Sequence, residues 1–214
     1  MGYKENKQFF DLYGGYVMDF TNWKWLNESR IAVRNDEVVI YAPGHEDWFC
    51  NPIPDGNGKL DKPVFGAPFF YTELEGDFVI SAKVRPDHRS TYDACALMVI
   101  ENEKLWTKLA FEASDFGTNA ICCVVTNEVS DDGNGCDIAQ DHVWLKIARV
   151  GNVFSTHYSL DGENYHMVRL FRLPVQRTVK VGIEAQCPTG DGGERFFYEV
   201  KIERRTVENL RKGR

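Results

Sequence analysis

Two apolar runs joined by a short polar segment most strongly limit how this chain can fold. Ala94–Ile100 and Trp106–Ala113 flank the tetrapeptide Glu101-Asn102-Glu103-Lys104. Two apolar runs around a short polar segment are the pattern of a β-hairpin with a short loop. The sequence therefore predicts a pair of antiparallel strands in the middle of the chain.

The second run alternates between charged and apolar side chains. Lys108 and Glu112 occupy one parity of the run, and Leu109 and Phe111 occupy the other. Because successive side chains of a strand point to opposite faces, we expect Leu109 and Phe111 in the core. Lys108 and Glu112 should then share a polar face that a ligand can reach.

Further short strands are expected on both sides of this hairpin, with turn residues such as Asp161-Gly162 between them. Almost no segment shows helical periodicity. This pattern predicts an all-β protein built as a two-sheet antiparallel sandwich. The polar segment Ser130–Asp137 is expected to be a loop. The expected strands are residues 30–33, 37–42, 69–74, 78–85, 121–127, 143–149, 154–160, 166–171, 178–185 and 195–203.

At 214 residues the chain fits one large β domain. We expect residues 1–22 to form an N-terminal docking segment with a helical turn near Phe9 and Phe10. Residues 23–205 should form the sandwich, and residues 206–214 a charged tail that frays.

The charge balance, 25 basic against 32 acidic residues, gives a net charge of −7, which argues against nucleic acid as a partner. No stretch approaches the roughly 18 apolar residues of a membrane helix, and the N-terminus has no apolar leader segment. We therefore expect a cytoplasmic protein.

The six cysteines of a cytoplasmic protein are best interpreted as free thiols or small buried side chains, not as disulfides or zinc ligands.

Several segments, taken in chain order, resemble a known family. They are Glu75-Gly76-Asp77-Phe78, Tyr92-Asp93-Ala94, Trp106-Thr107-Lys108, Phe111-Glu112, Trp144-Leu145-Lys146, Tyr158-Ser159-Leu160-Asp161-Gly162 and Val181-Gly182-Ile183. Together they resemble the family named after a regulator of enolase, domain of unknown function 1349, in the concanavalin A-like lectin/glucanase superfamily. The resemblance covers about residues 23–201 and departs from the family pattern at Ser130–Asp137. It implies a jelly-roll sandwich and, by analogy with similar domains appended to glycoside hydrolases, a carbohydrate ligand.

Glucanases of this superfamily carry three acids on one strand, spaced E-x-D-x-x-E. The closest match here is Glu75-Gly76-Asp77, but Ile80 occupies the position of the third acid. Because Glu75-Gly76-Asp77 is also typical of a turn, we do not expect that hydrolytic mechanism.

A different carboxylate pair could support an enzyme. Glu112 and Glu184 both lie on the outward parity of their strands, opposite Phe111 and Ile183. If the strands are neighbours, a close pair would raise one pKa and suit acid–base chemistry of a glycoside hydrolase- or lyase-like enzyme, with Lys108 as countercharge. The favoured interpretation is instead a salt-bridged polar face without catalysis.

Sugar recognition needs flat aromatic rings and convergent polar groups, and residues near the central strands supply both. We expect a carbohydrate or another small polar ligand on the concave face; a third hypothesis is a protein-interaction module that regulates a metabolic enzyme. The candidate ligand-binding residues are His45, Trp48, Tyr92, Asp93, Trp106, Lys108, Glu112, Glu184 and Gln186.

Two glycine-rich segments resemble calcium loops, Asp55-Gly56-Asn57-Gly58 and Asp132-Gly133-Asn134-Gly135. Lys59 and Cys136 occupy the third ligand position of each, so turns are the better interpretation. Calcium through Asp131, Asp132 or Asp137 stays an alternative, and we assign no metal or other cofactor.

Overall fold

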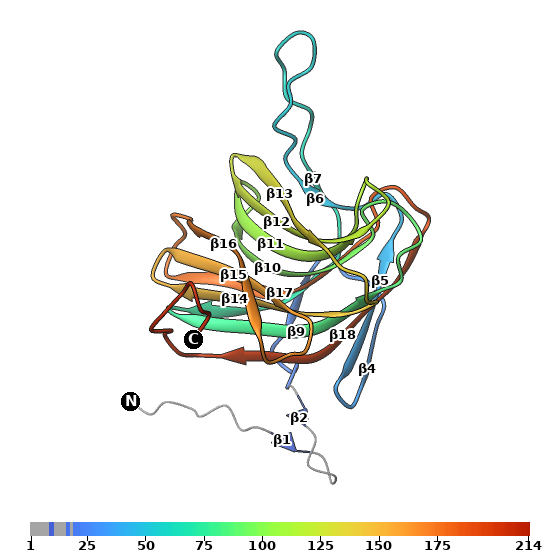
Figure 1. Cartoon of the computed structure of the whole chain (residues 1–214). Helices are drawn as coiled ribbons and strands as arrows, with labels where there is room; N and C mark the ends of the chain where they lie inside the picture. Colours follow the sequence, from blue (N-terminus) through green and yellow to red (C-terminus); the bar gives the residue numbers. More distant parts are fainter. Residues whose placement is uncertain (1–8, 11–15, 18) are drawn as a thin grey trace.

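Strands make up most of the computed structural model, which describes residues 9–10, 16–17 and 19–214 (Figure 1). In that part of the chain no helix has the length and hydropathy needed to cross a membrane. The strands are β1 Phe9–Phe10, β2 Tyr16–Val17, β3 Lys24–Leu26, β4 Ile31–Arg34, β5 Glu37–Pro43, β6 Trp48–Phe49, β7 Val64–Phe65, β8 Phe69–Glu75, β9 Phe78–Pro86, β10 Ala94–Asn102, β11 Leu105–Ala113, β12 Asn119–Asn127, β13 Val129–Asp137, β14 Val143–Val150, β15 Val153–Ser159, β16 Tyr165–Arg172, β17 Thr178–Gln186 and β18 Gly192–Glu203.

Two seven-stranded antiparallel sheets pack face to face, which confirms the predicted sandwich (Figure 1). The first sheet has the order β13-β12-β11-β10-β17-β8-β3, and the second has the order β16-β15-β14-β9-β18-β5-β4. The central hairpin is confirmed as β10 and β11. Leu109 and Phe111 lie in the core between the sheets, as their parity predicts.

The concave face of the first sheet is crossed by residues Glu46–Cys50, here called the crossing segment (Figure 1). At one end Glu46 forms a β-bridge with Cys187, just after β17. At the other end the backbone of Cys50 bonds to Ser130 of β13, with N···O distances of 2.8 and 2.9 Å. The crossing segment therefore spans the sheet from β17 to its edge strand.

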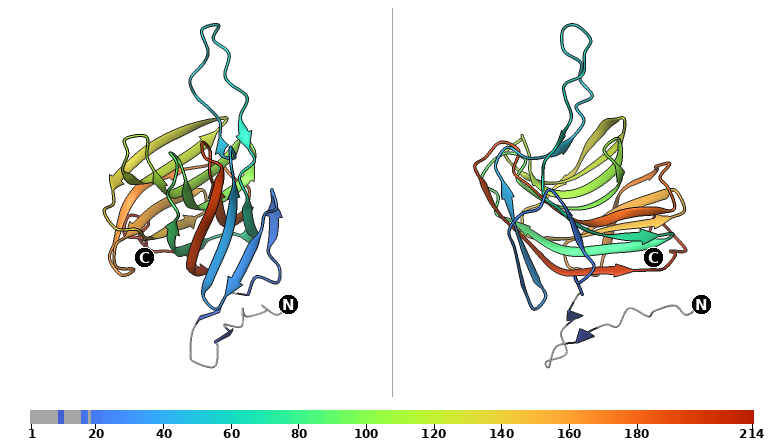
Figure 2. Two further views of the ribbon diagram at one scale, coloured as in Figure 1. Left: turned by 90° about the vertical axis from the view of Figure 1, so that its right-hand side faces the viewer. Right: turned by 180° about the vertical axis from the view of Figure 1, so that it is seen from behind.

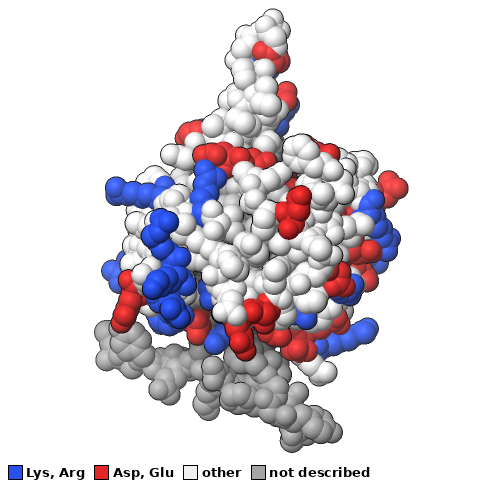
Figure 3. All heavy atoms as spheres, viewed as in Figure 1, with Lys and Arg blue, Asp and Glu red and all other residues white. Residues whose placement is uncertain are grey.

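A hairpin arm of residues 51–63 connects β6 and β7 and projects from the body of the molecule (Figures 1, 2 and 3). The sequence of this arm is rich in Pro, Gly, Asn and Asp. Its apolar side chains include Ile53, which is 70% exposed.

Residues Ser130–Asp137, expected as a loop, instead form most of the edge strand β13. The ladder to β12 follows a tight reversal at Glu128, whose φ is +70°. The segment is polar because an edge strand exposes most of its side chains. It therefore lacks the apolar residues by which a strand is recognised in the sequence. The prediction of a loop was wrong for this reason.

The C-terminal tail does not fray. Val207 is buried against Val79 and Ala148 on the outer face of the second sheet, and Leu210 packs beside them. The Leu210 carbonyl oxygen lies 3.0 Å from Nε2 of His157. The apolar side chains of Val207 and Leu210 therefore attach the charged tail to the second sheet.

At the N-terminus, Phe9–Phe10 pairs with Tyr16–Val17 as a short antiparallel ladder, so the helical turn expected there was wrong. Residues 1–8, 11–15 and 18 of the expected docking segment lie outside the described residues. All six cysteines are free thiols, and five of them are buried, as expected.

Candidate functional site

Four predicted site residues share the concave face of the first sheet. Ala94 of β10 pairs with Glu112 on one side and with Gln186 on the other, and Ala96 pairs with Glu184. Lys108 lies two ladder positions from Ala110 on the same face. The predicted alternation along β11 and β17 is thus confirmed, because the four polar side chains lie on one face of the sheet.

Lys108 does not face solvent, because the crossing segment covers it. Its Nζ donates to Oδ1 of Asp47 at 2.8 Å, to the carbonyl oxygen of Trp48 at 2.9 Å and to Oε1 of Gln186 at 2.6 Å. These contacts use all three N–H donors of the ammonium group. Only 2% of Lys108 is exposed, so the expectation of an open ligand contact at this residue was wrong.

Gln186 and Glu112 continue this network toward the rim. The Gln186 Nε2 donates to Oε2 of Glu112 at 3.1 Å and to the carbonyl oxygen of Tyr92 at 2.9 Å. The Cys122 Sγ lies 3.4 Å from Oε1 of Glu112 and 3.0 Å from Oδ1 of Asn134. Glu112 is half-buried and is therefore the point where the network approaches solvent.

Glu184 is fully buried, and neither of its carboxyl oxygens has a hydrogen-bond partner within the described part of the chain. Burial raises the pKa of Glu184 to about 8 and that of Glu112 to about 7, although the positive charge of Lys108 opposes both shifts. Burial disfavours the charged form of Lys108, but Asp47, Glu184 and Glu112 outweigh it and raise the pKa of Lys108. The face therefore holds an ammonium ion among carboxyl groups, one of them unpartnered.

Asp93 lies apart from this network in a buried ion pair. Its Oδ1 is 2.6 Å from Nη2 of Arg195, and its Oδ2 accepts the backbone N–H groups of Arg89 and Ser90 at 2.9 Å. Because Asp93 and Arg195 are both buried, the expectation that Asp93 contacts a ligand was wrong. Asp93 fixes the loop before β10.

The two predicted tryptophans, Trp48 of the crossing segment and Trp106 of β11, pack on each other. The ring centroids of Trp48 and Trp106 are 6.3 Å apart, and the rings meet edge to face. Trp106 is completely buried, so the expectation that it stacks on a ligand was wrong. Tyr92 is 37% exposed beside Glu112, and His45 is exposed before the crossing segment.

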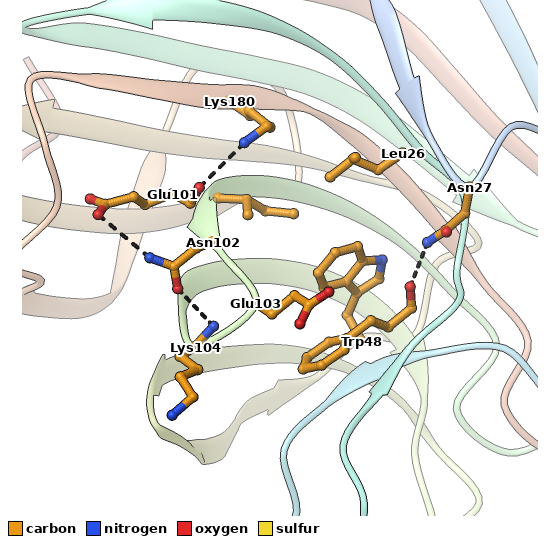
Figure 4. Close-up of a pocket in the computed structure, with 10 residues that line it drawn as sticks. Leu26, Asn27, Trp48, Glu101, Asn102, Glu103, Lys104 and Lys180 are labelled. Atoms are coloured by element: carbon orange, nitrogen blue, oxygen red, sulfur yellow. Dashed lines mark hydrogen bonds between the residues drawn. The ribbon is translucent and has the colours of Figure 1, made fainter.

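A cleft of about 510 Å³ opens on the same concave face, beyond Trp48 (Figure 4). Its lining combines apolar and polar side chains, and the polar ones come largely from the end of β10 and the turn to β11. This volume is within the range of about 300–1,000 Å³ typical of small-molecule sites. The apolar lining residues are Leu26, Trp48, Phe65 and Ile100, and the polar ones are Asn27, Glu101, Asn102, Glu103, Lys104 and Lys180.

Several polar groups of the cleft keep hydrogen-bonding capacity. The carboxylate of Glu103 lies beside Trp48 in Figure 4 and has no hydrogen-bond partner among the described residues. Lys180 Nζ donates to the carbonyl oxygen of Glu101 at 3.3 Å, which leaves two of its donors. Lys104 is paired with Glu128 at 2.7 Å. Sequence reasoning assigned Glu101–Lys104 only to a turn and missed these groups.

The acids considered for calcium have other contacts. Asp131 pairs with Arg169 at 2.7 Å, and Asp137 accepts from Thr118 at 2.8 Å. Within residues 9–10, 16–17 and 19–214, no group of three or more His, Cys, Asp or Glu side chains could hold a metal ion.

The two curved antiparallel sheets and the cleft on the concave face define a concanavalin A-like β-sandwich, the fold of lectins and glucanases. Residues 25–205 match the sequence profile of the protein family of unknown function DUF1349. The chain belongs to that family, as the resemblance of its strand motifs predicts. None of the curated proteins matches it in sequence.

Solved structures share this fold at low sequence identity. A functionally unknown protein from Saccharomyces cerevisiae is 22% identical with a TM-score of 0.77, over 87% of this chain and 98% of that one. The carbohydrate-binding module CBM66 from Bacillus subtilis is 13% identical with a TM-score of 0.55, over 85% and 95%. The exoplasmic/lumenal domain of VIP36, solved with Ca²⁺ and Man3GlcNAc, is 9% identical with a TM-score of 0.53, over 89% and 87%. At these identities the similarity concerns the fold.

Proposed function

We propose that this protein binds a carbohydrate in the cleft beside Trp48, without catalysis. The observation that carries this proposal is the combination of apolar and polar side chains in the lining of the cleft, where Glu103 and Lys180 retain free acceptors and donors. A sugar ring has both kinds of surface, since its C–H face is apolar and its edge carries hydroxyl groups.

The chemistry of the lining residues supports a neutral sugar. Phe65, which is half-buried, offers ring surface, and its ring centroid lies 5.4 Å from that of Trp48. Glu103 can accept from hydroxyl groups, and Lys180 can donate to them. The fold neighbours add support, because one is described as a carbohydrate-binding module and another was solved with the glycan Man3GlcNAc.

Isothermal titration with neutral mono- and oligosaccharides tests the proposal. For a sugar that binds, we expect Glu103→Ala and Lys180→Ala each to weaken affinity about tenfold, because each removes a charge-assisted hydrogen bond. The matched controls are Glu163→Ala and Lys212→Ala, at exposed positions outside the lining of the cleft. Failure of every sugar to bind, or equal losses in the controls, would refute the proposal.

A second candidate function is a glycoside hydrolase- or lyase-like reaction at Glu112 and Glu184. The raised pKa values of about 7 and 8 favour it, because they keep a protonated carboxyl group near neutral pH. The test is product release from polysaccharides by the wild-type protein and by Glu112→Gln. If the wild type releases no product from a saccharide that it binds, this candidate is excluded.

A further inference from the structure

We propose that a second ligand site lies on the concave face at Asp47, Glu112, Asp132 and Glu184, here called the acidic cluster, and that it binds the ammonium group of a small organic amine. This site lies apart from the cleft, whose lining includes none of these four residues. The inference therefore goes beyond sugar binding and does not depend on it.

The charge balance of the acidic cluster favours a cation. Lys108 is the cation that lies on this face among the four carboxyl groups, and its ammonium group pairs directly with Asp47. Asp132 lies on the same ladder row as Lys108, because both pair with Val124 of β12. Burial raises the pKa of Asp132, and the charge of Lys108 opposes that shift. The ammonium group of Lys108 thus lies near several acids, and the buried Arg195, which pairs with Asp93, adds only a weaker effect on Glu184.

Apart from the proton that Glu184 keeps near neutral pH, the remaining hydrogen-bonding capacity of the acidic cluster consists of acceptors. All three donors of Lys108 are used, by Asp47, Trp48 and Gln186. Both oxygens of Glu184, in contrast, lack a partner among the described residues, although the side chain is fully buried. Burying an unpartnered carboxyl group is costly, so a group with several N–H donors and a positive charge suits this position. A primary ammonium group has both properties.

Small side chains form the floor between the outer and inner acids. Glu112 on β11 and Glu184 on β17 are separated on this face by β10, where the side chains are those of Ala94 and Ala96. Ala110 and Cys122 complete the floor. An ammonium group that replaces the Gln186 amide on Glu112 would lie above these methyl groups, between the half-buried Glu112 and Glu184. Tyr92, exposed at the rim, can contact the cation with its ring.

A metal ion is a poorer match, because the described residues contain no group of His, Cys, Asp or Glu side chains arranged to hold one. A neutral polyol is also a poorer match, since its hydroxyl oxygens would find no free donor from Lys108.

Isothermal titration of the full chain with 1,4-diaminobutane and, as a neutral isostere, butane-1,4-diol tests the inference. We expect the diamine to bind and the diol not to bind at the same concentrations. Glu112→Gln and Asp132→Asn should each weaken diamine binding about tenfold, because each removes a charged acceptor. Glu163→Gln, an equal change of charge at an exposed turn, should leave it unchanged.

Equal binding of diamine and diol, no binding of the diamine, or equal affinity in the variants and the wild type would each overturn the inference. Asp132 is exposed on the edge strand, so Asp132→Asn keeps the test valid if Glu112→Gln fails to fold. Glu103→Ala separates the two proposals, because it should weaken sugar binding and leave diamine binding intact.

Discussion

The Nζ atom of Lys108 lies 2.8 Å from Oδ1 of Asp47, which joins the centre of the first sheet to the crossing segment. The two residues are 61 positions apart in the sequence. Lys108 is buried and the Asp47 side chain is 20% exposed, so the ion pair lies at the boundary of the interior. It fixes the segment that carries Trp48, which lines the cleft.

Replacing Lys108 should therefore destabilise the protein. Lys108→Met leaves Asp47, Gln186 and the Trp48 carbonyl group without their donor, and we expect a loss of about 2–4 kcal/mol in the free energy of unfolding. Urea unfolding measures this loss. Lys212→Met, at an exposed position, should change stability by less than about 0.5 kcal/mol. A near-neutral Lys108→Met would show that the ion pair contributes little.

Phe111 tests the assignment of the opposite face of β11. It is completely buried between the sheets, so Phe111→Ala should cost about 3–5 kcal/mol as a core truncation. Phe116 is a matched control, because it is 79% exposed in the following turn and its truncation should be nearly neutral. Thermal and urea unfolding measure the stability of the two variants. Similar losses of stability in both would contradict the placement of Phe111 on the core face of β11.

Glu184 should make stability depend on pH. Its pKa is about 8 in the folded protein, against 4.5 ordinarily, with Lys108, Asp47, Glu112 and Arg195 as the charges around it. Between these values the folded state holds a proton that the unfolded state has released, so stability is greatest below pH 4.5 for this group and is lost as pH rises through 8. The slope is at most about 1.4 kcal/mol per pH unit.

Unfolding measured between pH 5.5 and pH 9 checks this expectation. Glu184→Gln has no titrating group at this position and should show a smaller loss of stability over the same range. Parallel curves for the wild type and the variant would mean that Glu184 is already ionised when the protein is folded at neutral pH.

Asp93 should matter for stability and not for ligand binding. Asp93→Ala leaves the buried guanidinium group of Arg195 without its carboxylate, and we expect a loss of about 3–5 kcal/mol. Asp141→Ala, at an exposed aspartate, provides the control. If Asp93→Ala folds normally but loses affinity for a sugar or an amine, the structural role given to Asp93 is wrong.

The alternation along β11 was sufficient to place Lys108 and Glu112 on one face and Phe111 on the other, because strand geometry is local. Local geometry does not reveal what covers a face. The burial of Lys108 and Trp106 depends on the crossing segment, which comes from a distant part of the sequence. This tertiary contact is the reason that residues expected to bind a ligand are interior.

Composition was misleading where a strand is polar. Residues Ser130–Asp137 lack the apolar run by which the other strands are recognised, since an edge strand buries little. The cleft was missed because its polar residues are far apart in the sequence. Glu103 lies in the turn after β10 and Lys180 lies on β17, and the pairing of Ile100 with Lys180 brings these two regions together.

The anchoring of the crossing segment at both ends has a consequence for the shape of the first sheet. Its backbone hydrogen bonds to Cys187 and to Ser130 join two distant parts of the curved sheet. Flattening the sheet would therefore require one of these sets of bonds to break. We therefore expect the concave face to change little when a ligand binds, so that the entropic cost of binding falls mainly on the ligand.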